Sequence, residues 1–82
     1  MTKLEQKLIE LGYEKETIGL FRWFKNIKDD WFILMNLNCE NDEIQEYWID
    51  CYISTEQDMK DIQQAFNQLQ NDLKELKKYE NI

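Results

Sequence analysis

The sequence predicts an α+β fold of two layers, α-β-β-β-α, in which a three-stranded antiparallel meander carries both helices on one face. Two amphipathic helical patterns flank a central run of bulky and aromatic residues. Short polar turns divide that run into segments of strand length, and helices grouped outside a run of strands are typical of this class. We expect a single domain, 1–82, because a chain of 82 residues builds only one thin core.

The first helix is predicted near the beginning of the chain. Thr2 and Glu5 have capping-box spacing, in which each side chain satisfies a backbone N–H at the start of a helix. The apolar stripe that follows, at i, i+4 and i+7, consists of Leu4, Leu8 and Leu11. Gly12 is expected to end the helix, because glycine takes the left-handed conformation without a Cβ clash. Tyr13 should then pack back on Leu8.

Three strands are predicted over 18–25, 31–38 and 44–53, after a polar link at 14–17 and with turns at 26–30 and 39–43. The residues expected to face the helices are Trp31, Ile33, Met35 and Leu37 on the second strand and Tyr47, Ile49, Cys51 and Ile53 on the third. The first strand is apolar on both sides, with Leu20 and Phe24 on one and Phe21 and Trp23 on the other. The pattern therefore leaves open which of its sides is buried.

The uncovered face of the sheet is predicted to keep two or three aromatic side chains. The residues left on that face are Phe32 and Leu34 on the second strand and Glu46, Trp48, Asp50 and Tyr52 on the third. Aromatic rings beside carboxylates resemble an interface more than ordinary surface. The alternatives are that the second helix wraps differently or that the rings pack on one another.

A long second helix is predicted after Ser54, which has capping-box spacing to Gln57. Its apolar residues follow the 3 and 4 spacing of a heptad and are Met59, Ile62, Phe66, Leu69, Leu73 and Leu76. We expect the first half, from Met59 to Leu69, to pack on the sheet and the last turns to extend beyond it. Those turns would cap the first helix, fray, or pair with a second chain. The residues that would serve such a homodimer are Leu69, Leu73, Leu76 and Tyr79.

The composition argues against catalysis, cofactors and metals. The chain has no histidine, so Ser-His-Asp and Cys-His arrangements cannot form, and its two glycines cannot build a phosphate loop. Cys39 and Cys51 are too few for a structural zinc site and are expected to be reduced thiols, with Cys51 as a small buried hydrophobe. The acidic turn at 38–43 lacks the spacing and central glycine of an EF-hand loop. We therefore expect neither an enzyme nor a bound cofactor or metal.

The net charge of −7 is concentrated in the middle of the chain. Residues 1–28 carry +2, residues 62–82 are neutral, and residues 29–61 carry −9, because ten acidic residues there face Lys60 alone. This segment repels nucleic acid and favours a basic protein partner. The residues predicted to bind that partner are Asp29, Asp30, Glu40, Asp42, Glu43, Glu46, Trp48, Asp50 and Tyr52. Without an apolar span or a signal pattern in the sequence, a cytoplasmic protein that does not bind membranes is expected.

The two helical segments resemble small proteins of phages and mobile elements of AT-rich Gram-positive bacteria. The resemblance rests on residues 3–13, KLEQKLIELGY, on residues 65–78, AFNQLQNDLKELKK, and on the bias toward Lys, Asn and Ile. Such proteins are similar in size and acidity to anti-CRISPR and other host-takeover inhibitors, some of which mimic DNA with carboxylates. The resemblance implies a non-catalytic regulator or inhibitor that engages a basic, nucleic-acid-binding surface of a host protein. The alternative is a structural or assembly module that homodimerises through the C-terminal helix or the open sheet face.

Overall fold

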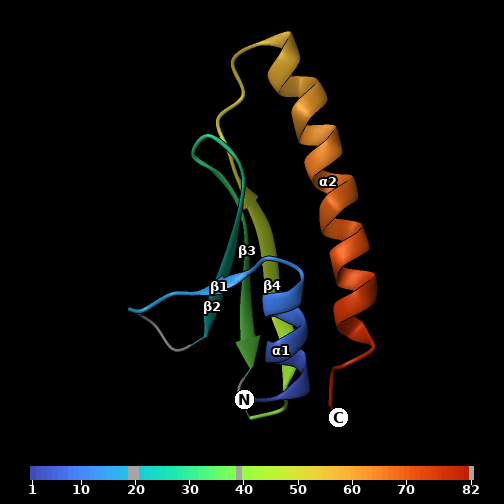
Figure 1. Cartoon of the computed structure of the whole chain (residues 1–82). Helices are drawn as coiled ribbons and strands as arrows, with labels where there is room; N and C mark the ends of the chain where they lie inside the picture. The colour runs from blue at the N-terminus through green and yellow to red at the C-terminus, as the bar shows by residue number, and fades with distance from the viewer. Residues whose placement is uncertain (19–20, 39, 82) are drawn as a thin grey trace.

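The computed structural model describes residues 1–18, 21–38 and 40–81 (Figure 1). The elements in chain order are α1 (Lys3–Glu10), β1 (Glu14–Lys15), β2 (Arg22–Lys28), β3 (Trp31–Asn38), β4 (Glu43–Asp50) and α2 (Glu56–Lys77). All strand pairs are antiparallel, and the order in the sheet is β1-β2-β3-β4. The predicted α+β class, with helices outside a run of strands, is confirmed.

The sheet has four strands, and the prediction of three was wrong because it treated residues 14–17 as a link. Glu14 pairs with Phe24, and Lys15 pairs with Trp23. A strand of two residues is too short to carry the alternation by which strands are recognised. The extra strand covers part of one edge of β2.

The turn between β2 and β3 is tighter than the sequence predicts. β2 continues to Lys28 and β3 begins at Trp31, so that only Asp29 and Asp30 form the turn. Asp29 has a φ of 43°, a left-handed conformation that aspartate tolerates in turns better than most residues. The predicted strand over 18–25 thus begins later and ends later. Gly19 and Leu20 of that strand, like Cys39, lie outside the described residues.

α1 begins and ends as the sequence predicts. Thr2 is the N-cap and forms a reciprocal capping box with Glu5. At the other end Gly12 has a φ of 98°, and the Tyr13 N–H donates to the Leu8 carbonyl at 2.9 Å. This is the Schellman arrangement, and it leaves the Tyr13 side chain 2% exposed.

α2 begins one residue later than the predicted cap. Thr55 is the N-cap and forms the capping box with Asp58, not Ser54 with Gln57. The prediction failed because aspartate at the N3 position fills the role usually given to glutamate or glutamine. Ser54 still contributes, since its N–H donates to the Asp58 carboxylate at 3.0 Å.

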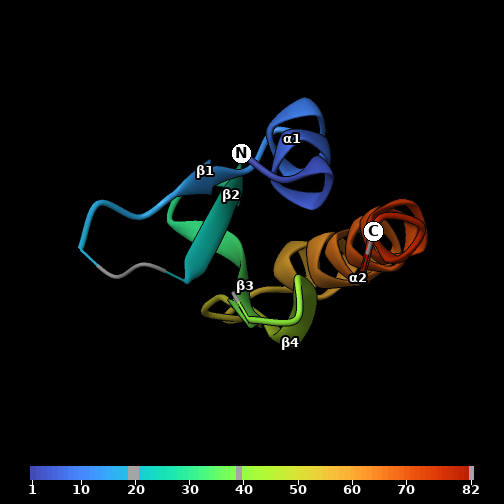
Figure 2. The same ribbon diagram turned by 90° about the horizontal axis from the view of Figure 1, so that it is seen from below.

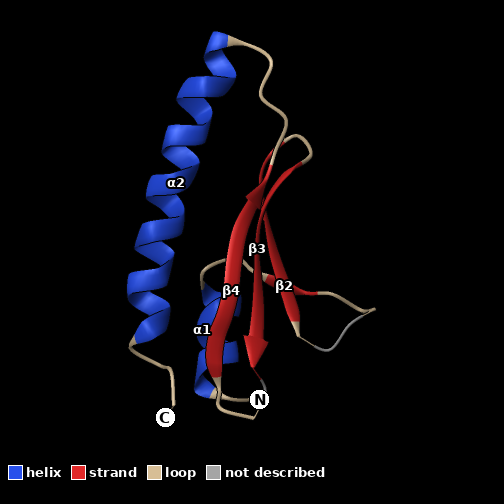
Figure 3. Ribbon diagram, turned by 180° about the vertical axis from the view of Figure 1, so that it is seen from behind, coloured by secondary structure: helices blue, strands red, loops and turns tan. Residues whose placement is uncertain are grey.

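The main hydrophobic core brings together residues of both helices and of the strands β2 and β3. It contains Leu4, Leu8, Tyr13, Trp23, Ile33, Met35, Leu37, Leu69 and Leu76. Figures 2 and 3 show α1 and α2 next to each other, with β3 and β4 beside α2. All four residues of β3 predicted to face the helices are buried. On β2 it is Trp23, 3% exposed, that enters the core, which resolves the choice left open by the sequence.

Two residues predicted to face the helices from the third strand are less covered than expected. Tyr47 is 48% exposed, because β4 is the last strand of the sheet. Ile53 is 42% exposed, because β4 ends at Asp50 and Ile53 belongs to the connection that leads to α2. Ile49 and Cys51 do pack against the core.

α2 buries a different stripe from the one its hydrophobic residues predict. The buried residues are Ile62, Ala65, Leu69, Asp72 and Leu76. They keep the 3 and 4 spacing, but Ala65 and Asp72 take the places that hydrophobicity assigned to Phe66 and Leu73. Phe66 is 53% exposed as a result.

The first half of α2 is buried at Ile62, Ala65 and Leu69, as predicted, but Met59 is not covered. Of the three alternatives for the last turns, contact with α1 is the one observed. Met59 near the start is 53% exposed, whereas Leu76 in the last turn is 0% exposed. The start of the helix projects past the strands, and its last turns lie beside α1 (Figure 1). Leu69 and Leu76 are core residues with no free surface for a second chain, while Leu73 and Tyr79 are partly buried. Homodimerisation itself stays a prediction.

Candidate functional site

The side of the sheet that points away from the shared core carries a second apolar group, here termed the open-face cluster: Phe24, Phe32, Leu34 and Trp48. The strand register places Phe24, Leu34 and Trp48 in one row across three strands. Phe32, two residues before Leu34, points to the same side. Its ring meets that of Phe24 in a T-shaped contact, with the centroids 6.0 Å apart.

The rings of Phe24 and Phe32 in the open-face cluster pack on each other. Leu34 is 9% exposed although it belongs to neither core cluster of the described residues, so its neighbours on this face must cover it. Phe24, Phe32 and Trp48 each keep part of their surface exposed. Partly exposed rings around a buried leucine form an apolar patch that a partner could cover.

Polar side chains border the open-face cluster. The guanidinium of Arg22 lies 5.4 Å from the centre of the Trp48 ring, and its Nε donates to the Asn36 side chain at 3.5 Å. Glu46 pairs with Asn36, and Asp50 pairs with Phe32, so both acids project beside the cluster. Arg22 was not singled out from the sequence, because only the strand register places it against Trp48.

Tyr52 does not join this face of the sheet. It was predicted to bind the partner with Trp48, but β4 ends at Asp50 and Tyr52 lies on the connection to α2. Its side chain is 77% exposed. An extended strand would have placed Tyr52 beside Asp50, and the end of the strand removes that constraint.

Six of the seven predicted partner-binding acids are divided between the two ends of the sheet, and Glu46 lies between the ends on β4. Asp29 and Asp30 form the β2–β3 turn, and Asp50 lies at the same end. The opposite end, at the β3–β4 turn, carries Glu40, Asp42 and Glu43. β3, with 8 residues, separates the ends by about 24 Å. The acids therefore do not form one continuous line of charge, as phosphates along DNA do.

None of these seven acids forms an ion pair within the described part of the chain. Its salt bridges include none of Asp29, Asp30, Glu40, Asp42, Glu43, Glu46 and Asp50. Two other acids of the −9 segment, Asp58 and Asp61, are both paired with Lys28. The negative charge that is left over for a partner thus lies on the turns, on β4 and on Glu56 in the first turn of α2.

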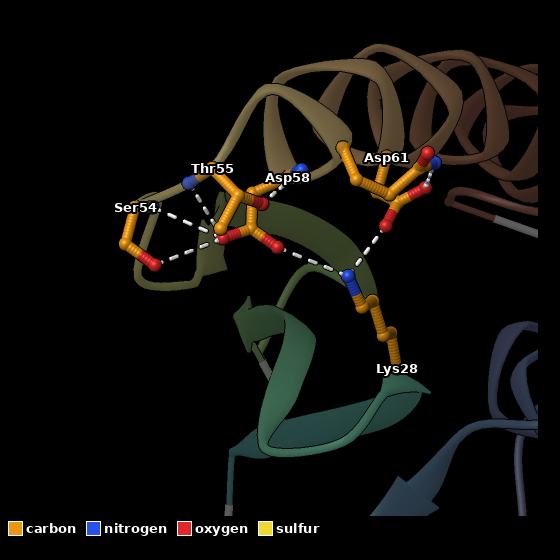
Figure 4. A network of polar contacts seen from close by, with 6 residues as sticks. Lys28, Ser54, Thr55, Asp58 and Asp61 are labelled. Atoms are coloured by element: carbon orange, nitrogen blue, oxygen red, sulfur yellow. Dashed lines mark hydrogen bonds and ion pairs between the residues drawn. The ribbon is translucent and has the colours of Figure 1, made fainter.

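Lys28 ties the β2–β3 hairpin to the start of α2 (Figure 4). Its ammonium group donates to Asp58 at 3.1 Å and also donates to Asp61. The Ser54 N–H and then Lys28 hold the pKa of Asp58 well below its usual value of 3.8. Lys28 and then Gln57 lower the pKa of Asp61 as well. Both carboxylates are therefore engaged in the fold.

We expect the protein to lose stability as the pH falls below about 4, partly through Asp58. A carboxyl whose pKa is lowered on folding stabilises the folded state above its unfolded-state pKa, and that contribution is lost as the pH falls through the lowered value. The measurement is the free energy of unfolding against pH for the wild type and for Asp58→Asn. The wild type should fall more steeply below about pH 4. Parallel stability curves for the wild type and Asp58→Asn would contradict this role. Glu40→Gln, on an exposed turn, is the matched control.

Asp72 of α2 carries a buried carboxylate that the sequence did not reveal. It lies between α2, β2 and Tyr13. Asp72 is 2% exposed and accepts hydrogen bonds from the Tyr13 hydroxyl at 2.8 Å, the Lys25 ammonium at 3.1 Å and the Gln68 amide at 2.9 Å. Burial, together with the hydrogen bond to Asp72, raises the pKa of Tyr13 well above its usual range. The only sequence signal was position, three residues after Leu69. The arrangement holds three segments of the fold together.

Neither a cluster of metal ligands nor a related protein identifies a function for the described residues. Within residues 1–18, 21–38 and 40–81, no three side chains among His, Cys, Asp and Glu come together as a metal site would require. Cys51 is a free, half-buried thiol. Among the described residues, no helix combines the length and the apolar character that crossing a membrane requires. Comparison with family models, curated proteins and solved structures finds no match.

Proposed function

We propose that this chain is a non-catalytic, acidic protein-binding regulator or inhibitor that engages a basic surface of a host protein. The observation that carries the proposal is the open-face cluster, with Trp48 at its edge and Glu46 and Asp50 beside it. A partly exposed tryptophan bordered by charges is typical of the residues that dominate binding energy. The proposal takes both helices to cover the opposite face, which the core shared by α1, α2 and β3 supports.

The distribution of charge supports a basic partner. No lysine or arginine occurs between Asp29 and Met59, the stretch that contains β3 and β4. Arg22, the base nearest the open-face cluster, already lies against Trp48. The resulting negative field attracts a basic surface and repels nucleic acid and anionic membranes. A protein that itself binds nucleic acid offers such a basic surface.

The setting of this function is also a proposal. We infer that the protein acts in the cytoplasm and is encoded by a phage or mobile element, on the resemblance of residues 3–13 and 65–78 to proteins of that origin. An anti-CRISPR-like inhibitor would then occupy the nucleic-acid-binding surface of its target. The division of the acids between two ends of the sheet favours contact at two points over imitation of a continuous DNA strand.

Replacing Trp48 with alanine should weaken binding of the partner about 30-fold, because an aromatic residue that anchors an interface contributes about 2 kcal/mol. Basic proteins captured from a bacterial extract at low salt supply the partner, and calorimetry measures the affinity. Glu46→Gln with Asp50→Asn should weaken binding and flatten its salt dependence. Ile9→Ala and Glu10→Gln on α1 are matched controls. An affinity that is unchanged by salt and by all these substitutions would rule the proposal out.

A homodimerising assembly module is the second candidate. Met59 and Phe66 of α2 are each 53% exposed and lie on one side of the helix, which favours an apolar contact with another chain. Met59 and Phe66 are thus the candidate dimer contacts in place of Leu69 and Leu76, which are buried in the core. Sedimentation across a range of protein concentrations distinguishes the candidates, because only the assembly module gains mass as concentration rises.

A further inference from the structure

The backbone of β4 has an unpaired edge in the described part of the chain. β4 is the last strand of the sheet and pairs only with β3. The Leu37 N–H donates to the Phe21 carbonyl, on the β2 side, so the backbone of its neighbour Asn36 points to β4. Asn36 is opposite Glu46. Glu46 therefore points back to β3, and the backbone of the next residue, Tyr47, points to the free edge.

The same alternation applies further along the strand. Ile49, two residues after Tyr47, also directs its N–H and C=O to the free edge. At the beginning of β4 the Ile44 N–H is already satisfied, because it donates to the Glu80 carboxylate at 2.8 Å. The groups available to another strand are thus those around Tyr47 and Ile49.

Exposed apolar side chains accompany this edge at the level of Tyr47. Tyr47 is 48% exposed, and Phe66 on α2 is 53% exposed. Ile49 packs against the cluster that contains Ile62. α2 runs in the direction opposite to β4 (Figure 1). Phe66 lies one turn after Ile62 on α2, and Tyr47 lies two residues before Ile49 on β4. Both steps lead toward the same end of the sheet. The two exposed rings therefore lie at the same height along the sheet.

The exposed rings also lie on the same side of the molecule. Asp72 turns one flank of α2 toward β2, where its carboxylate meets Lys25 at 3.1 Å. At 100° per residue, Phe66 lies about 120° from Asp72 around the helix, and Met59 lies within about 20° of Phe66. Because the strand order runs from β2 to β4, the flank of α2 that carries Phe66 and Met59 lies on the side of β4.

Charge decides which occupant the edge favours. Glu46 and Asp50 are exposed on β4, and β4 carries no base. A second copy of β4 would bring these carboxylates beside their own counterparts, and like charges on neighbouring strands are destabilising. A strand that carries lysine or arginine would instead place its ammonium or guanidinium groups beside Glu46 and Asp50.

We propose that the free edge of β4 binds an extended segment of the partner protein as an added strand, with apolar residues alternating with lysine or arginine. Main-chain hydrogen bonds to Tyr47 and Ile49 would hold the segment. Since side chains alternate between the two faces of a sheet, its apolar residues would point to Tyr47 and Phe66 and its basic residues to Glu46 and Asp50. The inference rests on the proposed function and deepens it by naming the segment that is recognised.

The test uses the whole chain and a synthetic peptide of alternating lysine and valine, as long as β4. Binding is measured by fluorescence titration, and hydrogen exchange reports the amides of Tyr47 and Ile49. We expect both amides to be protected by the peptide, and a peptide with the same residues in two blocks to bind about tenfold more weakly. Tyr47→Pro, which removes an N–H on the free edge and is tolerated there, should also cost about tenfold. Tyr47→Thr, which removes the ring and keeps the N–H, is the matched control.

Three results would overturn the inference. The first is equal binding of the two peptides, and the second is unchanged peptide binding by Tyr47→Pro. The third is self-association of the free chain that Tyr47→Pro abolishes, because that result would assign the edge to a second copy. If the captured partner is lost with Trp48→Ala but not with Tyr47→Pro, the edge inference is wrong while the proposed function stands. Loss with neither variant would remove both.

Discussion

Replacing Asp72 with alanine should lower the free energy of unfolding by about 3 kcal/mol. The substitution leaves the Lys25 ammonium and the Tyr13 hydroxyl without their buried partner. A chain of 82 residues is stabilised by only about 4–12 kcal/mol in total, so this loss is a large fraction. Urea denaturation followed by tryptophan fluorescence measures it, because Trp23 is buried in the same core.

The matched variant for Asp72 removes both charges at once. Lys25→Met with Asp72→Leu leaves no uncompensated buried charge, and apolar replacement of such a pair is often neutral or stabilising. The Tyr13 hydroxyl still lacks its acceptor in the double variant. We therefore expect the double variant to recover part of the stability that Asp72→Ala loses. A loss below about 1 kcal/mol for Asp72→Ala would show that the carboxylate is not a structural anchor.

Replacing Leu76 with alanine should cost about 3 kcal/mol, whereas Phe66→Ala should cost less than about 1 kcal/mol. Leu76 is 0% exposed within the core, and its truncation leaves a cavity; the Phe66 ring is 53% exposed. The two positions belong to the same hydrophobic stripe in the sequence, so their difference measures which stripe of α2 faces the sheet. Equal losses would mean that Phe66 is covered by the core and would contradict the observed orientation.

The elements that the sequence predicts best are those whose signals are local. α1 follows from the Thr2–Glu5 capping box and from Gly12, because both act within one turn of the chain. β3 follows from its run of bulky and aromatic residues between two polar turns. Phe32 and Leu34 could be assigned to the open face because successive side chains of a strand point to opposite faces.

The remaining features depend on contacts between distant segments. Trp23 and Phe24 are equally apolar, and only the packing of α1 and α2 decides that Trp23 is buried. Asp72 looks like a solvated acid until Tyr13 and Lys25 are brought to it, and its burial rotates α2 so that Phe66 is exposed. Arg22 was missed as a neighbour of Trp48, because a cation–π contact across strands requires the register.

The hydrogen bond between Tyr13 and Asp72 joins residues that are 59 positions apart. α1 can form early, since its caps are local, but Leu4 and Leu8 gain their full cover only when Leu69 and Leu76 arrive. During synthesis the apolar side of α1 must therefore wait until almost all of α2 has left the ribosome. A helix of 8 residues is only marginally stable by itself in water. The ordering of α1 is therefore coupled to the arrival of α2, the last element of the described fold.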